Sequence, residues 1–226
     1  EDVHAGEAIC FKSIWQDVEI YLDGEKVAEY SSKNSRPFGK NSAFRYIFVD
    51  LDESDIGKEL VYQFSSESKY AGDVREIYIG DRSSIWISLV TDAGTKTLIS
   101  TFLLLLAVIC IIVSLVFKAS YKRTLPLYYL GWTIFFCAFW VLTEIPVRQL
   151  LIKNMSILTY YSYWSLMMIP ICLMLYVNEI QAGYYKKIYM VPLCYASGAF
   201  VVTTVMQVLN IAEFTQMLTF VHVGLV

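Results

Sequence analysis

The sequence is poor in the residues and motifs that enzymes use for chemistry. It has two histidines and five cysteines among 226 residues, and it contains no glycine-rich nucleotide loop and no CxxC, HExxH or GxSxG motif. Basic residues are also too few and too scattered for a nucleic-acid surface. These absences leave no catalytic, cofactor or metal site to predict, and they exclude nucleic acid as an expected partner.

Cysteine is nearly absent from the first part of the chain, which excludes a disulfide framework there. Cys10 is the one cysteine before Lys96. We expect it to be a buried strand residue, or else to pair with a cysteine that precedes Glu1. The other four lie inside apolar runs, where a free cysteine behaves as a small hydrophobic residue. They are Cys110, Cys137, Cys172 and Cys194.

Acidic residues almost disappear after Lys96. Of the 21 in the chain, 18 lie within residues 1–96, which carry a net charge of −7, whereas the remainder carries +4. A division this sharp is not typical of one soluble globule. It predicts a water-exposed domain joined to an integral membrane part, with the lipid bilayer as a partner.

Apolar runs of membrane-spanning length follow this change of composition. The first carries no charge over 21 residues, and a bilayer core of about 30 Å needs roughly 20 apolar helical residues. Pro170 lies inside the third run, where neighbouring helices can satisfy the carbonyl group that it frees. Small residues at 196–199 in the fourth predict close helix packing. We predict spans at residues 97–117, 125–143, 160–177 and 188–209, and the start of a fifth from about 214.

Charges in the short connections predict the orientation of these spans. Lys118, Lys122 and Arg123 follow the first span, and Lys186 and Lys187 follow the third. Because positively charged loops favour the cytoplasmic side, both connections are expected inside the cell. The acidic N-terminal domain is then expected outside the plasma membrane.

Residues 1–90 show the alternation of short strands and no helical periodicity. Residues 17–22 alternate polar and apolar side chains, and Asp23-Gly24 separates them from residues 26–30. This is typical of a type I′ hairpin, whose two central residues both need positive φ. The pattern predicts an extracytoplasmic antiparallel β-sandwich over residues 1–90. Further strands are expected at residues 43–51, 59–64, 75–79 and 85–89.

Only residues 91–96 are left to link this domain to the first span. A linker this short would pass movement of the domain to the first helix, as a receptor requires. A short stalk without a signalling role is the alternative.

Single residues with functional potential are few. Aromatic side chains of the strand domain are candidates for a carbohydrate-like or small-molecule site, although such residues are more often core; these are Trp15, Tyr70 and Trp86. His222 lies in the fifth run, where a hydrogen bond between helices is the expected role, and His4 lies in a loop. Solvation at the membrane interface accounts for Glu144 and Glu179, which lie at span ends.

Three stretches in order resemble a bacterial receptor architecture. They are residues 18–30 (VEIYLDGEKVAEY), 48–68 (FVDLDESDIGKELVYQFSSES) and 76–85 (EIYIGDRSSI), directly followed by several spans. The chain is similar to the seven-transmembrane receptors with diverse intracellular signalling modules, particularly clostridial forms that end in a GGDEF diguanylate cyclase. The resemblance implies a jelly-roll, galactose-binding-like sandwich, seven helices, and a cytoplasmic output module such as a diguanylate cyclase or histidine kinase.

The resemblance also sets the expected extent and partners of the protein. Without an initial Met or secretion signal, and with its end inside an apolar run, the chain is expected to be a fragment. Missing early strands, later spans and the output module are part of that expectation. An extracellular ligand, which is carbohydrate-like or another small molecule, and a homodimer through the output module are the expected partners.

Two functions are therefore open. The first is a sensory receptor in which an extracellular ligand regulates a cytoplasmic module. The alternative is a polytopic transporter or membrane enzyme with an exported domain that captures substrate. Transporters and membrane enzymes usually place charged groups at mid-span depth, and the first four runs have none. The sequence therefore favours the receptor.

Overall fold

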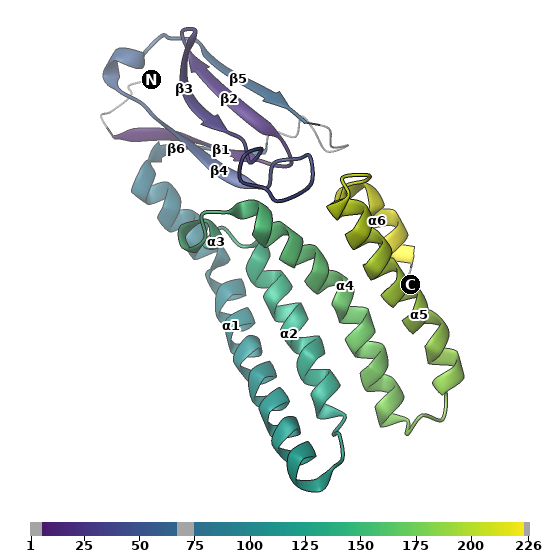
Figure 1. The fold of residues 1–226 in the computed structure, drawn as a ribbon. Coiled ribbons are helices and arrows are strands. Elements are labelled where there is room, and N and C mark those ends of the chain that lie inside the picture. The colour runs from purple at the N-terminus through teal and green to yellow at the C-terminus, as the bar shows by residue number, and fades with distance from the viewer. Residues whose placement is uncertain (1–5, 67–74, 224–226) are drawn as a thin grey trace. The chain divides into compact units, whose positions relative to one another are not determined.

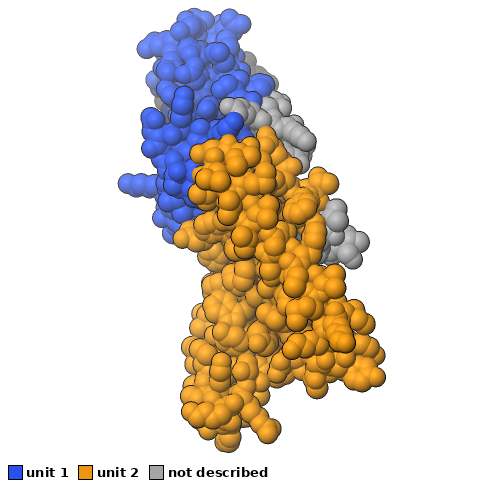
Figure 2. All heavy atoms as spheres, turned by 45° about the vertical axis from the view of Figure 1, so that its right-hand side comes forward, with its two compact units in different colours: residues 1–94, 146–158 blue, residues 95–145, 159–226 orange. Residues whose placement is uncertain are grey.

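The computed structural model describes residues 6–66 and 75–223, and the chain divides into two compact units (Figure 1, Figure 2). The sheet unit comprises residues 1–94 together with 146–158, and the helical unit comprises residues 95–145 together with 159–226. Residues 146–158 therefore belong to the sheet unit, although helices of the other unit flank them in sequence.

Two three-stranded antiparallel sheets make up the described strands of the sheet unit. Sheet A has the order β4-β1-β6 and sheet B the order β3-β2-β5. Five predicted strands are confirmed, and their ends lie within two residues of the predicted ends. Strand β1 was not predicted. The bounds are β1 Glu7–Ser13, β2 Asp17–Leu22, β3 Glu25–Tyr30, β4 Arg45–Asp50, β5 Leu60–Ser65 and β6 Arg75–Asp81, with a 3₁₀ turn, η1, at Glu53–Asp55.

The predicted hairpin joins β2 to β3. Asp23 and Gly24 have φ values of 50° and 82°, and the flanking residues Leu22 and Glu25 pair across the turn. A type I′ turn needs positive φ at both central positions, which glycine adopts without a steric penalty and aspartate tolerates. The local sequence therefore determines this turn.

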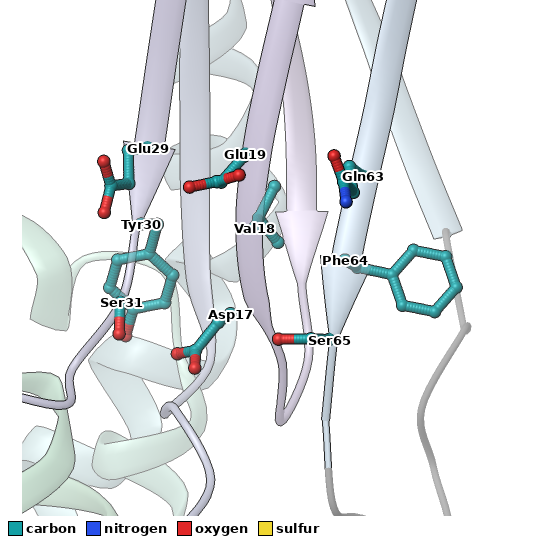
Figure 3. A pocket seen from close by; sticks show the side chains of 9 residues that line it. All are labelled: Asp17, Val18, Glu19, Glu29, Tyr30, Ser31, Gln63, Phe64 and Ser65. Carbon is teal, nitrogen blue, oxygen red and sulfur yellow. The ribbon is translucent and has the colours of Figure 1, made fainter. Parts of the chain in front are cut away.

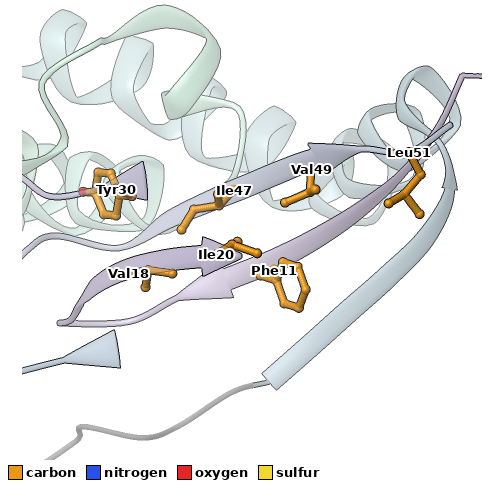
Figure 4. Packing of buried hydrophobic residues seen from close by; sticks show 7 residues of the cluster. All are labelled: Phe11, Val18, Ile20, Tyr30, Ile47, Val49 and Leu51. Atoms are coloured by element: carbon orange, nitrogen blue, oxygen red, sulfur yellow. The ribbon is translucent and has the colours of Figure 1, made fainter. Parts of the chain in front are cut away.

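A hydrophobic core lies between the two sheets (Figure 4). Sheet A contributes odd-numbered residues and sheet B even-numbered ones, as the two-residue period of a strand requires. Each fully buried large apolar side chain stabilises the unit by roughly 1.5–3 kcal/mol. The buried members are Phe11, Val18, Ile20, Tyr30, Ile47, Val49 and Leu51.

Helix α1 (Arg82–Tyr121) packs its first turns on the opposite face of sheet A. Ile85 and Leu89 are buried there against Cys10 and Tyr46. The predicted strand at residues 85–89 is therefore wrong, because it lies within this 40-residue helix, and residues 91–96 are helical as well. Ile85, Leu89 and Ala93 are buried at a spacing of four, which places them on one helical face.

Four described helices, α1, α2, α4 and α5, are long and apolar enough to cross a membrane. The predicted spans lie within them or differ by a few residues at their ends, and the chain is thus a candidate membrane protein. The bounds are α2 Leu127–Glu144, α4 Met155–Ile180, α5 Lys186–Val208 and α6 Phe214–Val223, while the short α3, Arg148–Leu151, belongs to the sheet unit.

Small residues let helices of the helical unit approach closely. A Cβ atom on Gly131 of α2 would lie 2.9 Å from Ile111 Cγ1 and 3.2 Å from the carbonyl oxygen of Ala107, both in α1. On α5, Ala196 and Ala199 are buried as predicted, whereas a Cβ on Gly198 would meet nothing within 4 Å. Close packing of small residues is a common means of helix association in lipid.

Candidate functional site

Two of the aromatic residues suggested by the sequence, Trp15 and Trp86, lie in different elements of the sheet unit. Trp86 lies in α1 and stacks on Phe48 of β4, with ring centroids 5.2 Å apart. Trp15 lies in the connection between β1 and β2, where its carbonyl oxygen accepts a hydrogen bond from the Ser66 hydroxyl. Tyr70, His4 and the His222 side chain lie outside the described residues. A ligand role for these aromatic residues stays a prediction.

The even-numbered side chains of sheet A form an aromatic face beneath α1. Phe44 precedes β4, and Tyr46, Phe48 and Tyr78 project from β4 and β6 toward the side where α1 packs. Phe44 and Tyr46 meet edge to face at 5.2 Å. We call these four residues the aromatic face. Offset and edge-to-face ring contacts of this kind add about 0.5–1.5 kcal/mol each to the energy of burial.

An ion pair lies at one side of the aromatic face. Lys12 Nζ is 2.6 Å from Glu76 Oε1 and lies over the rings of Phe44 and Tyr46, at 5.5 and 5.9 Å. Partial burial opposes ionisation of Glu76, but the hydrogen bond and charge of Lys12 outweigh it and lower the pKa of this carboxyl. Burial raises the pKa of Tyr46, and the Glu76 charge adds to that effect. Glu76 is therefore ionised and Tyr46 neutral at neutral pH.

The segment 146–158 attaches to the edge of sheet A through Gln149. The Gln149 side-chain Oε1 accepts a hydrogen bond from the Tyr46 N–H at 2.9 Å, and its Nε2 donates to the Tyr46 carbonyl at 2.8 Å. Strand β4 lies at the edge of the sheet, so among the described strands none pairs with this side of Tyr46. One side-chain amide thereby takes the place of a strand residue, and it covers an edge that would otherwise be open.

Arg148 strengthens the same attachment. Its side chain is 6% exposed, and its guanidinium carbon lies 4.8 Å from the centre of the Phe44 ring. A cation over an aromatic ring contributes more when both are removed from water, to about 2 kcal/mol. Burial raises the pKa of Tyr30 to about 12, although the positive charges of Arg45 and Arg148 act in the opposite direction.

Asn154 links the segment to the start of α4. Its Oδ1 accepts from the backbone N–H of Ile157 at 3.3 Å, in the position of an N-cap. Its Nδ2 donates to the carbonyl oxygen of Ser35 at 2.8 Å, in the connection between β3 and β4. One side chain therefore caps a membrane-length helix and binds the sheet unit at the same time.

The start of α1 is fixed in a comparable way. Asp81, the last residue of β6, accepts hydrogen bonds from the N–H and hydroxyl of Ser84, at 2.9 and 3.2 Å, and so caps the helix. Arg82 pairs with Asp50 of β4 at 2.8 Å and lies 5.0 Å from the Phe48 ring. The ion pair is exposed and contributes at most about 1 kcal/mol. Strand β6 passes directly into α1 with no linker between them.

Together these contacts form what we call the attachment site: sheet A, residues 82–94 of α1, and residues 146–158. All of its parts belong to the sheet unit. Both α1 and α4 begin in this unit and continue into the helical unit. Within the described residues no group of three or more metal-ligating side chains occurs. The arrangement connects sheet A to the first turns of α1 and α4.

The outer face of sheet B carries a polar hollow (Figure 3). Glu29, Glu19 and Gln63 lie in one row across β3, β2 and β5, because each is paired directly with its neighbour. Lys26 holds the two carboxylates together, at 2.7 Å from Glu29 and 3.2 Å from Glu19. Opposed like charges on neighbouring strands are otherwise unfavourable. The hollow measures about 280 Å³ and is also lined by Asp17, Val18, Tyr30, Ser31, Phe64 and Ser65.

No protein-family model, curated protein or solved structure matches this chain. No sequence pattern predicted Gln149 or Asn154 as attachment residues, or the hollow on sheet B. The alternation in β2 and β5 does place Glu19 and Gln63 on the polar faces of their strands. Only knowledge of how the strands pair would have predicted that the two side chains lie next to each other.

Proposed function

We propose that this protein is a membrane sensory receptor whose sheet unit detects an extracellular ligand and passes the signal to the membrane helices. The observation that carries the proposal is the double attachment of sheet A. Residues 82–94 and 146–158 both belong to the sheet unit, and each leads without a break into a membrane-length helix. A domain that merely needs an anchor requires one connection.

The hollow on sheet B is the ligand site in this proposal. Carboxylate, amide and hydroxyl groups of this kind suit a polyhydroxylated or carbohydrate-like ligand. Val18 and Tyr30 line the hollow and also belong to the core that joins sheet B to sheet A. A change in the packing of sheet B would thus alter the packing at the attachment site. A ligand can shift the equilibrium between two conformations of the protein only by the difference in its affinity for them.

The rest of the proposal follows the family resemblance. The sheet unit would be part of a jelly-roll sandwich outside the bacterial plasma membrane, and a cytoplasmic module, such as a diguanylate cyclase acting as a homodimer, would give the output. Positive charges after α1 and α4 support this orientation. Labelling of Lys153→Cys but not Lys122→Cys by an impermeant thiol reagent on intact cells is expected. The reverse pattern would overturn the orientation.

The coupling is tested by distance measurement on the full chain in nanodiscs. Sugars that raise its melting temperature are first selected, and spin labels at Lys122→Cys and Lys187→Cys then report the end of α1 and the start of α5, which follows α4 in the chain. A selected sugar should shift the distance distribution between the labels. About ten Gly/Ser residues inserted after Gly94, whose ends wander roughly 15–20 Å, combined with Gln149→Ala should abolish the shift while binding persists. A bound sugar that leaves the distances unchanged in the original chain would contradict the receptor proposal.

A further inference from the structure

Basic and aromatic residues gather at the two connections on one side of the helical unit. The connection between α1 and α2 and that between α4 and α5 lie at the same end of these helices (Figure 1). Helices that each cross a membrane once place alternate connections on the same side. We call this set the basic end; its members are Lys118, Tyr121, Lys122, Arg123, Tyr184, Tyr185, Lys186 and Lys187.

The five cations of the basic end are exposed. In the described part of the chain, none of their side chains takes part in an ion pair or hydrogen bond with a carboxylate. Three lysines of the sheet unit behave differently, since Lys12, Lys26 and Lys58 each pair with an acidic residue. Arg148, in the connection between α2 and α4, is buried against Phe44. Unbalanced positive charge is therefore concentrated at one end of the helices.

The two lysines at α5 also stand against the helix dipole. Lys186 and Lys187 are its first residues, and its first turn contains no acidic residue. The N-terminal end of a helix is positive and favours negative groups. The preference of lysines for cytoplasmic loops accounts for the side of the membrane on which Lys186 and Lys187 lie. It does not account for their position in the first turn of α5. A bound anion would offset both the two charges and the dipole.

Aromatic side chains accompany the cations at both connections. Tyr184 is 82% exposed, Tyr121 66% and Tyr185 47%, and Tyr184 and Tyr185 meet edge to face at 4.7 Å. Tyrosine suits the level of lipid headgroups, because its ring is apolar and its hydroxyl is polar. The surface therefore matches a partner with phosphate at the depth where the acyl chains begin.

We propose that the basic end binds the phosphate groups of anionic phospholipids. Clusters of four to eight Lys or Arg next to a membrane span attract anionic lipid, at about fivefold in affinity for each charge. The site does not depend on receptor function. It would bias the positions of α1 and α5 according to the lipid composition of the membrane.

The test is native mass spectrometry of the full chain in neutral detergent with phosphatidylglycerol and phosphatidylcholine. Phosphatidylglycerol should be retained preferentially. Lys186→Gln with Lys187→Gln should weaken that binding about tenfold or more, and Lys33→Gln with Lys58→Gln, which removes the same charge from the sheet unit, should leave it unchanged. Circular dichroism verifies that each variant is folded.

Three results would overturn the proposal. One is equal retention of the two lipids by the original chain. Another is unchanged phosphatidylglycerol affinity in the folded Lys186/Lys187 variant. The third is release of the lipid by millimolar soluble glycerol phosphate, which would show that the site binds free phosphate rather than a lipid headgroup. Weaker binding at about 0.5 M salt supports the proposal, because exposed charges are screened there.

Discussion

Replacing Gln149 by alanine tests the attachment of the 146–158 segment directly. The change removes two hydrogen bonds to the backbone of Tyr46, one donated by its N–H and one accepted by its carbonyl. Each is worth about 1 kcal/mol net. The cost of opening this edge should therefore fall by about 2 kcal/mol, which is a factor of roughly 30 in an equilibrium constant.

Hydrogen exchange of single backbone amides in the full chain measures this change. The Tyr46 N–H points toward Gln149, so its exchange should accelerate by up to about 30-fold in Gln149→Ala. Successive amides of a strand point to opposite sides, so the Ile47 N–H faces β1 and serves as an internal control. Its exchange should change little.

Gln149→Glu is a matched variant that separates the two bonds. A carboxylate still accepts from the Tyr46 N–H but cannot donate to its carbonyl. Its effect on Tyr46 exchange should be smaller than that of alanine. If Tyr46 exchanges at the original rate in folded Gln149→Ala, the segment is not attached through this residue and the reasoning fails.

Three further predictions concern the turn, the helix contact and the ion pair. Gly24→Val should lower the free energy of unfolding of the sheet unit by about 1 kcal/mol or more, because φ is 82° there; an unchanged thermal midpoint would contradict the type I′ turn. Gly131→Ala should cost about 1–3 kcal/mol by forcing α2 away from α1, whereas Gly198→Ala, which meets open space inside α5, should leave stability unchanged or raise it by up to about 1 kcal/mol in the same detergent unfolding assay. Lys12 lowers the pKa of Glu76 in the folded protein below its ordinary value of 4.5. The ion pair therefore stabilises the folded state above pH 4.5, and this stabilisation is lost as the pH falls through the lower pKa of the folded state. Glu76→Gln should flatten this acid dependence of the melting temperature.

The sequence predicted the elements whose pattern is local. Residues 17–22 alternate because one face of β2 is buried and the other is polar, and Asp23-Gly24 specifies the turn that follows. Strand β1 was missed because both of its faces are covered. Cys10 packs toward α1 and Phe11 toward sheet B, so two successive residues are buried and the alternation disappears. Burial on both faces is a property of the assembled unit.

The start of α1 was misread for a different reason. Residues 85–89 are rich in isoleucine and contain a tryptophan, which favours a strand, whereas Asp81 and the four-residue spacing of Ile85, Leu89 and Ala93 favour a helix. A run of five residues is too short for periodicity to decide between them. The cap at Asp81 and continuity with the uncharged run determined the outcome.

The attachment site itself has no signature in the sequence. Gln149 recognises the backbone of a residue 103 positions away, and any side chain at position 46 would present the same N–H and carbonyl groups. Arg148 follows the second predicted span as a single basic residue, and only its burial against Phe44 shows how it contributes to the sheet unit. The contacts depend on tertiary structure, which local pattern does not contain.

In the receptor proposed above, two attachments would constrain a signal more than a single short linker would. The sequence suggested a six-residue linker, which would pass movement of the domain to the first helix. The structure has a helix that starts on sheet A and a second segment that holds the same sheet through Gln149 and caps α4 through Asn154. Loss of either attachment leaves the other, so a single lesion should reduce transmission and only the combination should remove it. A rearrangement of sheet A that released Gln149 would also act on Asn154, five residues later, and thus on the first turn of α4. The two helices would then respond together, as coupling between a sensor and a helix bundle requires.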